Sequence, residues 1–204
     1  MLDHLVYATG NLTTTVDELA HGLGVRPSPG GRHPELGTEN CLADLGNGAY
    51  LEIIGPDGGL PPPGGRPFGI DALPAAKLVA WAARTRDMSG LIKRLTLVGW
   101  NPGPVISMAR RDRAGSLLRW DLTVRDDSRD GGVLPFFIDW GITSHPTRTA
   151  AGGLRLASFR AAHPDPATMA ALLTASGEAL TVDYGPEPAL TAVICGPGGT
   201  MVLT

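Results

Sequence analysis

The sequence predicts an α+β protein built from repeated βαβββ units, whose strands form curved and mostly antiparallel sheets. An apolar strand precedes each of three predicted helices, about three strands follow each helix, and a glycine closes each helix. These glycines are Gly24, Gly99 and Gly177, which recur at intervals of 75 and 78 residues. Recurrence of one structural pattern at a nearly fixed period indicates a repeat architecture.

The repeat divides the chain into three units and one connecting segment. Residues 1–55 form the first βαβββ unit, residues 75–146 the second, and residues 147–204 a third unit of similar kind. Residues 56–74 are rich in proline and glycine. This composition predicts a linker with little internal structure between the first two units.

Local signals define the elements of the first unit. Its helix is predicted to begin near Thr15, which opens a capping box, and to end at Gly24, which can adopt the left-handed conformation. A hairpin is predicted over residues 40–54, because Asn-Gly lies there between two apolar runs. The Pro/Gly-rich residues 26–37 indicate either a loop or an edge strand.

The second and third units carry similar signals. Asp87 can cap the second helix, and the third helix is expected to open with Asp165 at the N-cap and Pro166 in the first turn. Residues 105–109 form a predicted strand. The charged residues 110–115 that follow indicate a hairpin tip.

The best chemical lead is a histidine and a glutamate on two predicted strands. Glu52 lies in an apolar strand, where it shares a face with Tyr50 and Ile54, and His4 lies on the first strand. A buried carboxylate is costly unless another group pairs with it or coordinates it. One helix and a hairpin separate the two strands, so we expect His4 and Glu52 to meet on one sheet.

Composition excludes several classes of protein. The 204 residues are 43% hydrophobic and 18% charged, which is too apolar for a disordered chain. The net charge is −3 and the basic residues form no stripe, which argues against a nucleic-acid partner. The two cysteines, Cys41 and Cys195, show neither metal-binding nor redox spacing.

Missing motifs narrow the function further. There is no G-x-G-x-x-G and no P-loop, so we expect no nucleotide cofactor. The chain opens directly on a strand without a charged leader, and no apolar run approaches the length of a membrane span. We therefore expect a cytoplasmic protein that has a small-molecule partner and does not bind membranes.

Several short stretches around the predicted His4 and Glu52 positions form a recognisable set. They are Asp3-His4-Leu5-Val6-Tyr7-Ala8, Gly31-Arg32-His33-Pro34, Gly37-Thr38-Glu39-Asn40, Tyr50-Leu51-Glu52-Ile53-Ile54, and Pro135-Phe136-Phe137-Ile138-Asp139-Trp140 with His145-Pro146. This set resembles the vicinal oxygen chelate superfamily, and most closely its glyoxalase-like subgroup. The resemblance covers residues 1 to about 146 by motif and the third unit by pattern alone.

The resemblance implies the glyoxalase/dihydroxybiphenyl dioxygenase fold, in which paired units form a curved sheet around a divalent metal. Such a metal polarises the oxygens of a small substrate. The implied function is a metal-dependent lyase, isomerase or dioxygenase that acts on a small oxygenated compound. The alternative is a metal-free protein of the same fold that binds or sequesters a small aromatic or anionic molecule. A third unit either packs on the other two or completes a pairing across a homodimer.

Within this family pattern, His4 and Glu52 are the expected metal ligands. They are otherwise an acid–base pair, or a buried hydrogen-bonded pair without a catalytic role. Glu52 and His33 are the expected catalytic residues. His33 lies in a Gly-rich stretch that could cover the pocket, although a surface turn explains that stretch equally well.

Four further residues form the expected substrate-binding set. Arg32 suits a substrate carboxylate, because its planar fork binds two oxygens. Asn40, Trp140 and His145 complete the set. Each of the four also has a simpler interpretation: Arg32 as a surface charge, Asn40 as a turn residue, Trp140 as part of the core and His145 as a loop residue.

The second unit departs from the family pattern at the ligand positions. Aligning the two units places Ala80 where His4 stands and Ile138 opposite Glu52. Neither side chain can hold a metal, whereas a catalytic metal usually keeps about three protein ligands. A neighbouring histidine or carboxylate would have to complete a metal site.

Overall fold

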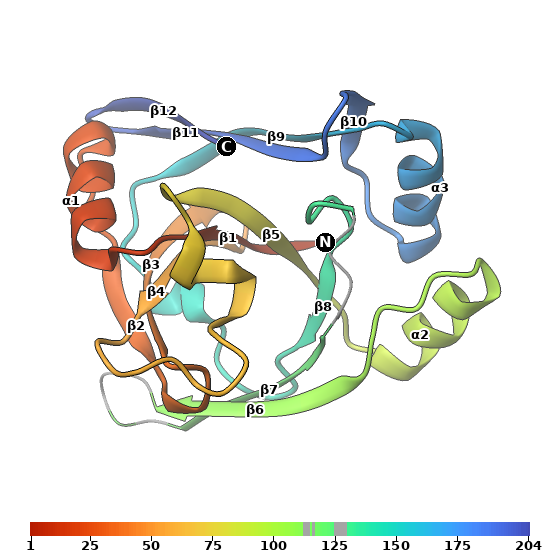
Figure 1. Cartoon of the computed structure of the whole chain (residues 1–204), viewed down its shortest axis with the longest axis horizontal. Coiled ribbons are helices and arrows are strands. Elements are labelled where there is room, and N and C mark those ends of the chain that lie inside the picture. The colour runs from red at the N-terminus through yellow and green to blue at the C-terminus, as the bar shows by residue number, and fades with distance from the viewer. Residues whose placement is uncertain (112–114, 116, 125–129) are drawn as a thin grey trace.

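The computed structural model describes residues 1–111, 115, 117–124 and 130–204. The centre of the predicted hairpin tip, residues 112–114, lies outside the described residues. Over the described residues the elements follow the predicted order of strand, helix and three strands in each of three successive units (Figure 1). The α+β class with curved, mostly antiparallel sheets is confirmed.

The elements of each unit are bounded as follows. The first unit contains β1 (Leu2–Ala8), α1 (Leu12–Leu23), β2 (Ser28–His33), β3 (Thr38–Gly46) and β4 (Ala49–Pro56). The second contains β5 (Lys77–Arg84), α2 (Met88–Leu97), β6 (Val105–Arg111), β7 (Leu117–Thr123) and β8 (Phe136–Asp139). The third contains β9 (Arg155–His163), α3 (Pro166–Ser176), β10 (Thr181–Tyr184), β11 (Ala189–Gly196) and β12 (Gly199–Leu203). Short 3₁₀ segments lie at Pro34–Leu36, Pro67–Ala72 and Pro146–Arg148.

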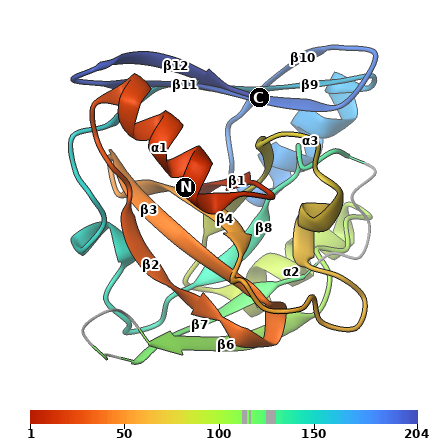
Figure 2. The same cartoon turned by 60° about the vertical axis from the view of Figure 1, so that its left-hand side comes forward.

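The first two units share one sheet. Counted over the described residues it has eight strands in the order β2-β3-β4-β1-β5-β8-β7-β6. β1 and β5 pair antiparallel at its centre, and each pairs in parallel with the last strand of its own unit, β4 or β8. The sheet curls until its two edge strands, β2 and β6, contact each other (Figure 2). The result is a nearly closed barrel with one unit on each side.

Side-chain alternation separates the core from the interior of the barrel. On β1 and β4, Leu5, Leu51 and Ile53 are buried in the same cluster as Leu19 of α1. Glu52 lies between two of these residues and points to the other face of the sheet, because successive side chains on a strand alternate. One face of the sheet therefore packs on helices, and the other face lines the barrel.

The third unit forms its own four-stranded sheet across one side of the barrel (Figure 1). Its inward residues, Leu190, Ala192 and Ile194, belong to the same core cluster as Leu5 of β1. The Gly198 backbone nitrogen, near the end of this sheet, donates to the last turn of α1 at 2.9 Å. The third unit thus packs on the other two within a single chain.

The third unit repeats the order of elements but not the order of strands. Its sheet runs β10-β9-β11-β12, so the opening strand β9 lies between β10 and β11 and the last strand lies at the edge. In the first two units the opening strand pairs with the last strand, and its other edge meets the opening strand of the neighbouring unit. β9 has no such neighbour, and both of its edges are taken within its own sheet.

The helix ends follow the predictions except at the start of α1. Asn11, not Thr15, is the N-cap, and its side chain accepts from the Thr14 backbone nitrogen at 3.1 Å. Thr15 instead is buried and its hydroxyl bonds to that of Thr9 at 2.8 Å. The predicted caps of the other two helices and the left-handed Gly24 are confirmed.

No helix among the described residues is long and apolar enough to cross a bilayer.

The predicted linker, residues 56–74, carries more structure than its composition indicates. It contains the 3₁₀ segment Pro67–Ala72, and Arg66 beside this segment is buried. The Arg66 guanidinium donates to the Gly37 carbonyl at 2.6 Å and pairs with Asp71 at 2.5 Å. Proline and glycine weaken regular backbone pairing, and here side-chain hydrogen bonds hold the segment against the barrel.

Candidate functional site

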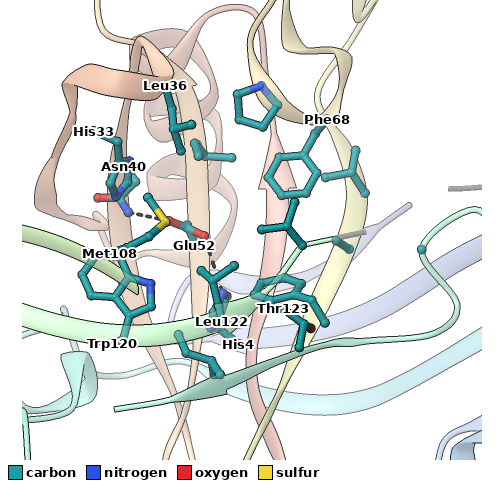
Figure 3. A pocket seen from close by; sticks show the side chains of 18 of the residues that line it. His4, His33, Leu36, Asn40, Glu52, Phe68, Met108, Trp120, Leu122 and Thr123 are labelled. Atoms are coloured by element: carbon teal, nitrogen blue, oxygen red, sulfur yellow. Dashed lines mark hydrogen bonds and ion pairs between the residues drawn. The ribbon is translucent and has the colours of Figure 1, made fainter. Parts of the chain in front are cut away.

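A pocket of about 710 Å³ lies inside the curve of the barrel (Figure 3). Its size suits a small organic molecule. The polar residues on one wall are His4, His33, Asn40, Tyr50, Glu52 and Arg110. The rest of the lining is largely apolar and includes Leu36, Ile54, Phe68, Ile106, Met108, Trp120, Leu122, Phe136 and Ile138.

His4 and Glu52 meet on the polar wall. The parallel pairing of β1 with β4 sets Val6 opposite Glu52 and brings the two side chains to one face of the sheet. His4 Nε2 lies 3.7 Å from Glu52 Oε2 (Figure 3). The His4 ring is 3% exposed and stacks on Tyr50 with centroids 4.6 Å apart. The pair is thus packed from behind and borders the pocket.

Asp3 sets the tautomer of His4. Its Oδ1 lies 2.7 Å from His4 Nδ1. An ionised carboxylate accepts hydrogen bonds and cannot donate them. We therefore assign the proton of the neutral ring to Nδ1, which leaves the lone pair on Nε2, the nitrogen that faces Glu52. A carboxylate behind a histidine in this way fixes the orientation of the ring and its tautomer.

The second oxygen of Asp3 accepts hydrogen bonds from side chains behind the site. Asp3 is fully buried, and its Oδ2 accepts from Arg84 Nε at 2.7 Å and from Trp140 Nε1 at 3.1 Å. Burial by itself raises the pKa of Asp3. Hydrogen bonds with His145 and His4 outweigh that effect and hold the pKa of Asp3 well below its usual range. Asp3 is therefore ionised at neutral pH.

Trp140 and His145, two predicted substrate-binding residues, both contact Asp3. Trp140 borders the pocket, but its indole N–H is committed to Asp3. His145 Nε2 lies 3.1 Å from Asp3 Oδ2 and 2.7 Å from Arg84 Nη2, and His145 is not part of the pocket lining. Its ring instead packs edge-on against Tyr50 and Trp140. His145 thus lies behind the site and can affect His4 through Asp3.

Asn40 and His33 lie beside Glu52 on the polar wall. The Asn40 amide donates to Glu52 Oε1, and its oxygen accepts from the Gly31 backbone nitrogen at 2.9 Å. Burial lowers the pKa of His33 more than the negative charge of Glu52 raises it, and the charge of Arg110 lowers it further. His33 is therefore neutral near pH 7.

Arg32 lies outside the pocket lining. Its side chain is exposed and pairs with the carboxylates of Asp57 and Glu39 at 3.6 and 3.8 Å. β2 turns this side chain outward. The structure thus supplies Arg32 with two anionic partners from its own chain and separates it from the pocket residues.

Arg110 is a pocket residue that the sequence pattern predicts to lie in a hairpin tip. β6 extends through Arg111, so Arg110 continues the alternation begun by Ile106 and Met108 on the pocket face. That period of two is visible in the sequence, but the neighbouring run of charges favours a turn. Asp3 could also have been found, since it directly precedes a predicted buried histidine.

The sequence of residues 2–177 matches the family model described as Glyoxalase-like domain. The chain belongs to this glyoxalase-like family. The match spans the barrel and ends just after α3. No curated protein matches the sequence.

Several solved structures are similar to this glyoxalase-like chain. A hypothetical protein from Staphylococcus aureus has a TM-score of 0.64 at 15% identity, over 98% of this chain and 83% of its own. Methylmalonyl-CoA epimerase from Mycobacterium tuberculosis has a TM-score of 0.44 at 21% identity, over 69% of this chain and 87% of its own. Methylmalonyl-CoA epimerase from Streptomyces coelicolor has a TM-score of 0.45 at 18% identity, over 68% of this chain and 95% of its own. The Staphylococcus protein shows that the fold extends over the third unit.

The two paired units of this glyoxalase-like domain differ at the position of Glu52. The N-caps of α1 and α2 lie 76 residues apart, and so do Val6 and Ala82. Val6 pairs with Glu52, and Ala82 pairs with Phe136. By strand register, Phe136 is therefore the counterpart of Glu52 in the second unit. The sequence alignment had placed Ile138 at that position. Both residues are apolar, so the second unit supplies no donor there.

The donor set does not fit a catalytic metal centre. Within the described part of the chain, no group of three or more His, Cys, Asp or Glu side chains could hold a metal ion. His4 and Glu52 contribute two donors, and one Glu52 oxygen is already bonded to Asn40. Ala80 and Phe136 occupy the matching positions of the second unit. A catalytic metal usually keeps about three protein ligands, whereas His4 and Glu52 supply two, and in the described residues no third such side chain joins them.

The pKa of Asp3 leads to a prediction about stability. The unfolded chain binds a proton at Asp3 as the pH falls through about 4, whereas the folded chain does not until lower pH. Asp3 therefore stabilises the fold above that pH, and the stabilisation is lost as the pH falls toward the folded-state pKa. Asp3→Asn should lower the free energy of unfolding at pH 7 by about 3–5 kcal/mol and flatten its decline in acid.

Urea unfolding between neutral pH and about pH 3 measures both effects, since the transition spans the titration of an ordinary Asp. The matched control is Asp17→Asn, which removes an exposed carboxylate paired with Arg26. The control should change stability by less than about 1 kcal/mol. Wild-type stability and an unchanged acid slope in Asp3→Asn would contradict the assignment.

Proposed function

We propose that this glyoxalase-like protein is a metal-independent enzyme that moves a proton on a small oxygenated substrate. The observation that supports it is the buried Asp3–His4 pair, in which the neutral ring carries its proton on Nδ1 and has its lone pair on Nε2, beside the pocket. A histidine in this state is a general base near neutral pH.

The proposed step is a simple proton transfer. His4 Nε2 accepts a proton from an acidic C–H or O–H group of the substrate, and the electron pair of that bond stays on the substrate. Asp3 at Nδ1 and Glu52 beside Nε2 stabilise the imidazolium that forms. Return of the proton to another atom gives an isomer, and loss of a neighbouring leaving group gives a lyase product.

The surroundings of the pair suit this step. Burial raises the pKa of Tyr50 well above its usual value, and the charges of Asp3 and Glu52 raise it further. Tyr50 is therefore a neutral phenol near pH 7. It stacks on the His4 ring and does not act as a second base. The apolar wall opposite displaces water, which strengthens the electrostatic interactions around the reacting atoms.

Deuterium exchange tests the proposal whatever the product of the reaction is. In D₂O the wild type should exchange an acidic C–H of at least one compound in a panel of 2-oxo acids, hydroxyketones and their neutral amides, followed by proton NMR. His4→Gln should lower that rate by about 10²–10⁴-fold, the usual contribution of a general base.

The control is His21→Gln, which changes an exposed histidine on α1 that is not part of the pocket lining and should exchange at the wild-type rate. Circular dichroism checks that each variant is folded. Equal exchange by His4→Gln, or no exchange with any compound of the panel, would contradict the proposal.

The lack of a third ligand among the residues that the structure describes gives a prediction about metal content. Elemental analysis of the purified protein should find no divalent metal near one per chain, and the double variant His4→Ala/Glu52→Gln should have the same content. Exchange activity should survive EDTA. A stoichiometric metal that disappears in the double variant would restore the metal-dependent version of the function.

A second candidate is a metal-free protein that binds or sequesters a small molecule. The broad apolar wall that contains Trp120 and Phe136 favours it. The two candidates differ in one measurement. A compound that quenches tryptophan fluorescence but shows no catalysed exchange at an acidic position supports sequestration, and exchange that depends on His4 supports catalysis.

A further inference from the structure

Arg110 is a buried cation without a carboxylate partner among the described residues. Arg110 is 7% exposed, and its Nη1 donates to the Gly30 carbonyl at 2.6 Å. The described chain gives it no other hydrogen bond or ion pair. Proteins rarely bury a charge unless it is paired. The counter-charge is therefore expected to come from a bound molecule.

The seam between β2 and β6 holds Arg110 in a defined orientation. A Cβ on Gly31 would lie 2.7 Å from Arg110 Nη1, and one on Gly30 would lie 2.3 Å from Asn40 Oδ1. The two glycines thus make room for both polar side chains. The bond to the Gly30 carbonyl engages one nitrogen of the guanidinium and leaves the others without a partner in the described chain.

The free nitrogens of Arg110 are accessible. Trp100 Nε1 is the one side-chain nitrogen or oxygen in the described residues that is both sealed from solvent and unbonded. The unbonded guanidinium nitrogens are therefore not sealed, and Arg110 lines the pocket. They can donate to a ligand that enters there.

The neighbouring groups do not neutralise this charge by contact. His33 is uncharged near neutral pH because burial lowers its pKa. Glu52 is the carboxylate of the polar wall, and its two oxygens face Asn40 and His4. The polar wall thus presents a cation at Arg110 and the proposed base at His4 to the same pocket.

We propose that Arg110 binds the carboxylate of the substrate, and that the substrate is a small monocarboxylate with an apolar body. The planar guanidinium fork matches the two oxygens of a carboxylate. One guanidinium balances one negative charge, whereas a phosphate ester brings nearly two. Trp120 and Leu122 on the adjacent strand β7 receive the apolar body. The inference rests on the proposed function where it calls this molecule a substrate.

Three probes of similar shape test whether Arg110 selects the charge of a carboxylate. Calorimetry at low salt compares 3-phenylpropanoate, its neutral amide 3-phenylpropanamide, and phenyl phosphate. The wild type should bind the carboxylate at least about tenfold more tightly than the amide, which corresponds to about 1.4 kcal/mol. It should also prefer the carboxylate to the phosphate. Arg110→Gln should abolish the difference between carboxylate and amide.

Two arginine variants make the comparison specific. Arg119→Gln removes an exposed arginine from the adjacent strand β7 and should keep the preference. Arg32→Gln should keep it too, since Arg32 is exposed and paired with Asp57. Loss of the preference in Arg32→Gln would transfer the role to that residue and overturn the proposal.

Arg110 also closes the barrel, so a second variant guards against misfolding. Arg110→Lys keeps the charge and a donor for Gly30 but loses the fork, and it should reduce the preference several-fold. If Arg110→Gln does not fold, Arg110→Lys and the wild-type comparison decide. Equal affinity for carboxylate and amide, tighter phosphate binding, an unchanged preference in the variant, or no binding of any probe would each overturn the proposal.

The binding test is independent of the proton transfer. A carboxylate preference that depends on Arg110, with no exchange on any compound, contradicts the proposed function and leaves this inference standing. Exchange that depends on His4 but shows no preference for anionic compounds contradicts this inference and leaves the proposed function standing.

Discussion

The buried carboxylate of Asp3 is the interaction on which the rest of the site depends. Its cost of desolvation is met by donors from several parts of the chain: His4 beside it on β1, Arg84 from β5, and Trp140 after β8. These strands belong to both paired units. A single charge therefore joins the two halves of the barrel and at the same time orients the ring that faces the pocket.

The barrel is nearly symmetric in its backbone and asymmetric in its chemistry. β1 and β5 take equivalent places at the centre of the sheet, but the polar groups around the pocket come mostly from the first unit. At the position that matches Glu52 the second unit places Phe136, which packs edge-on against the His4 ring. This substitution removes a ligand that a metal would need and replaces it with a surface that excludes water. The proposed proton transfer by His4 requires no metal ligand from the second unit.

Arg110 adds a second constraint. It bonds across the seam between the edge strands β2 and β6 through Gly30 and carries a positive charge into the pocket. One residue thus links the closure of the barrel to the class of molecule that the barrel can accept. The separation between a fixed cation and a fixed base would then select where on a bound molecule the proton is removed.

Patterns within short stretches of sequence predicted the features that depend on neighbouring residues alone. Alternation along β1 and β4 was enough to place His4 and Glu52 on one face, and the left-handed Gly24 marks the end of α1. Features that depend on contacts distant in sequence were missed. Arg32 lies outside the pocket and pairs with Asp57, which is distant in sequence, and Arg110 faces inward because β6 runs longer than its charges indicate.

The strand order of the third unit was also beyond local signals. It depends on which strand edges remain free after the first two units have paired, and no property of residues 147–204 alone encodes that. The packing of the predicted linker has a similar cause, since the carbonyl of Gly37 that receives Arg66 lies in the preceding unit.

The most direct measurement of the central claim is the tautomeric state of His4 by nitrogen-15 NMR at neutral pH, assigned by comparison with a His4→Gln sample. The structure predicts a proton on Nδ1, a short hydrogen bond from it to Asp3, and an unprotonated Nε2. A ring that carries its proton on Nε2, or that exchanges freely between both tautomers, would contradict the assignment of His4 as a base oriented by Asp3.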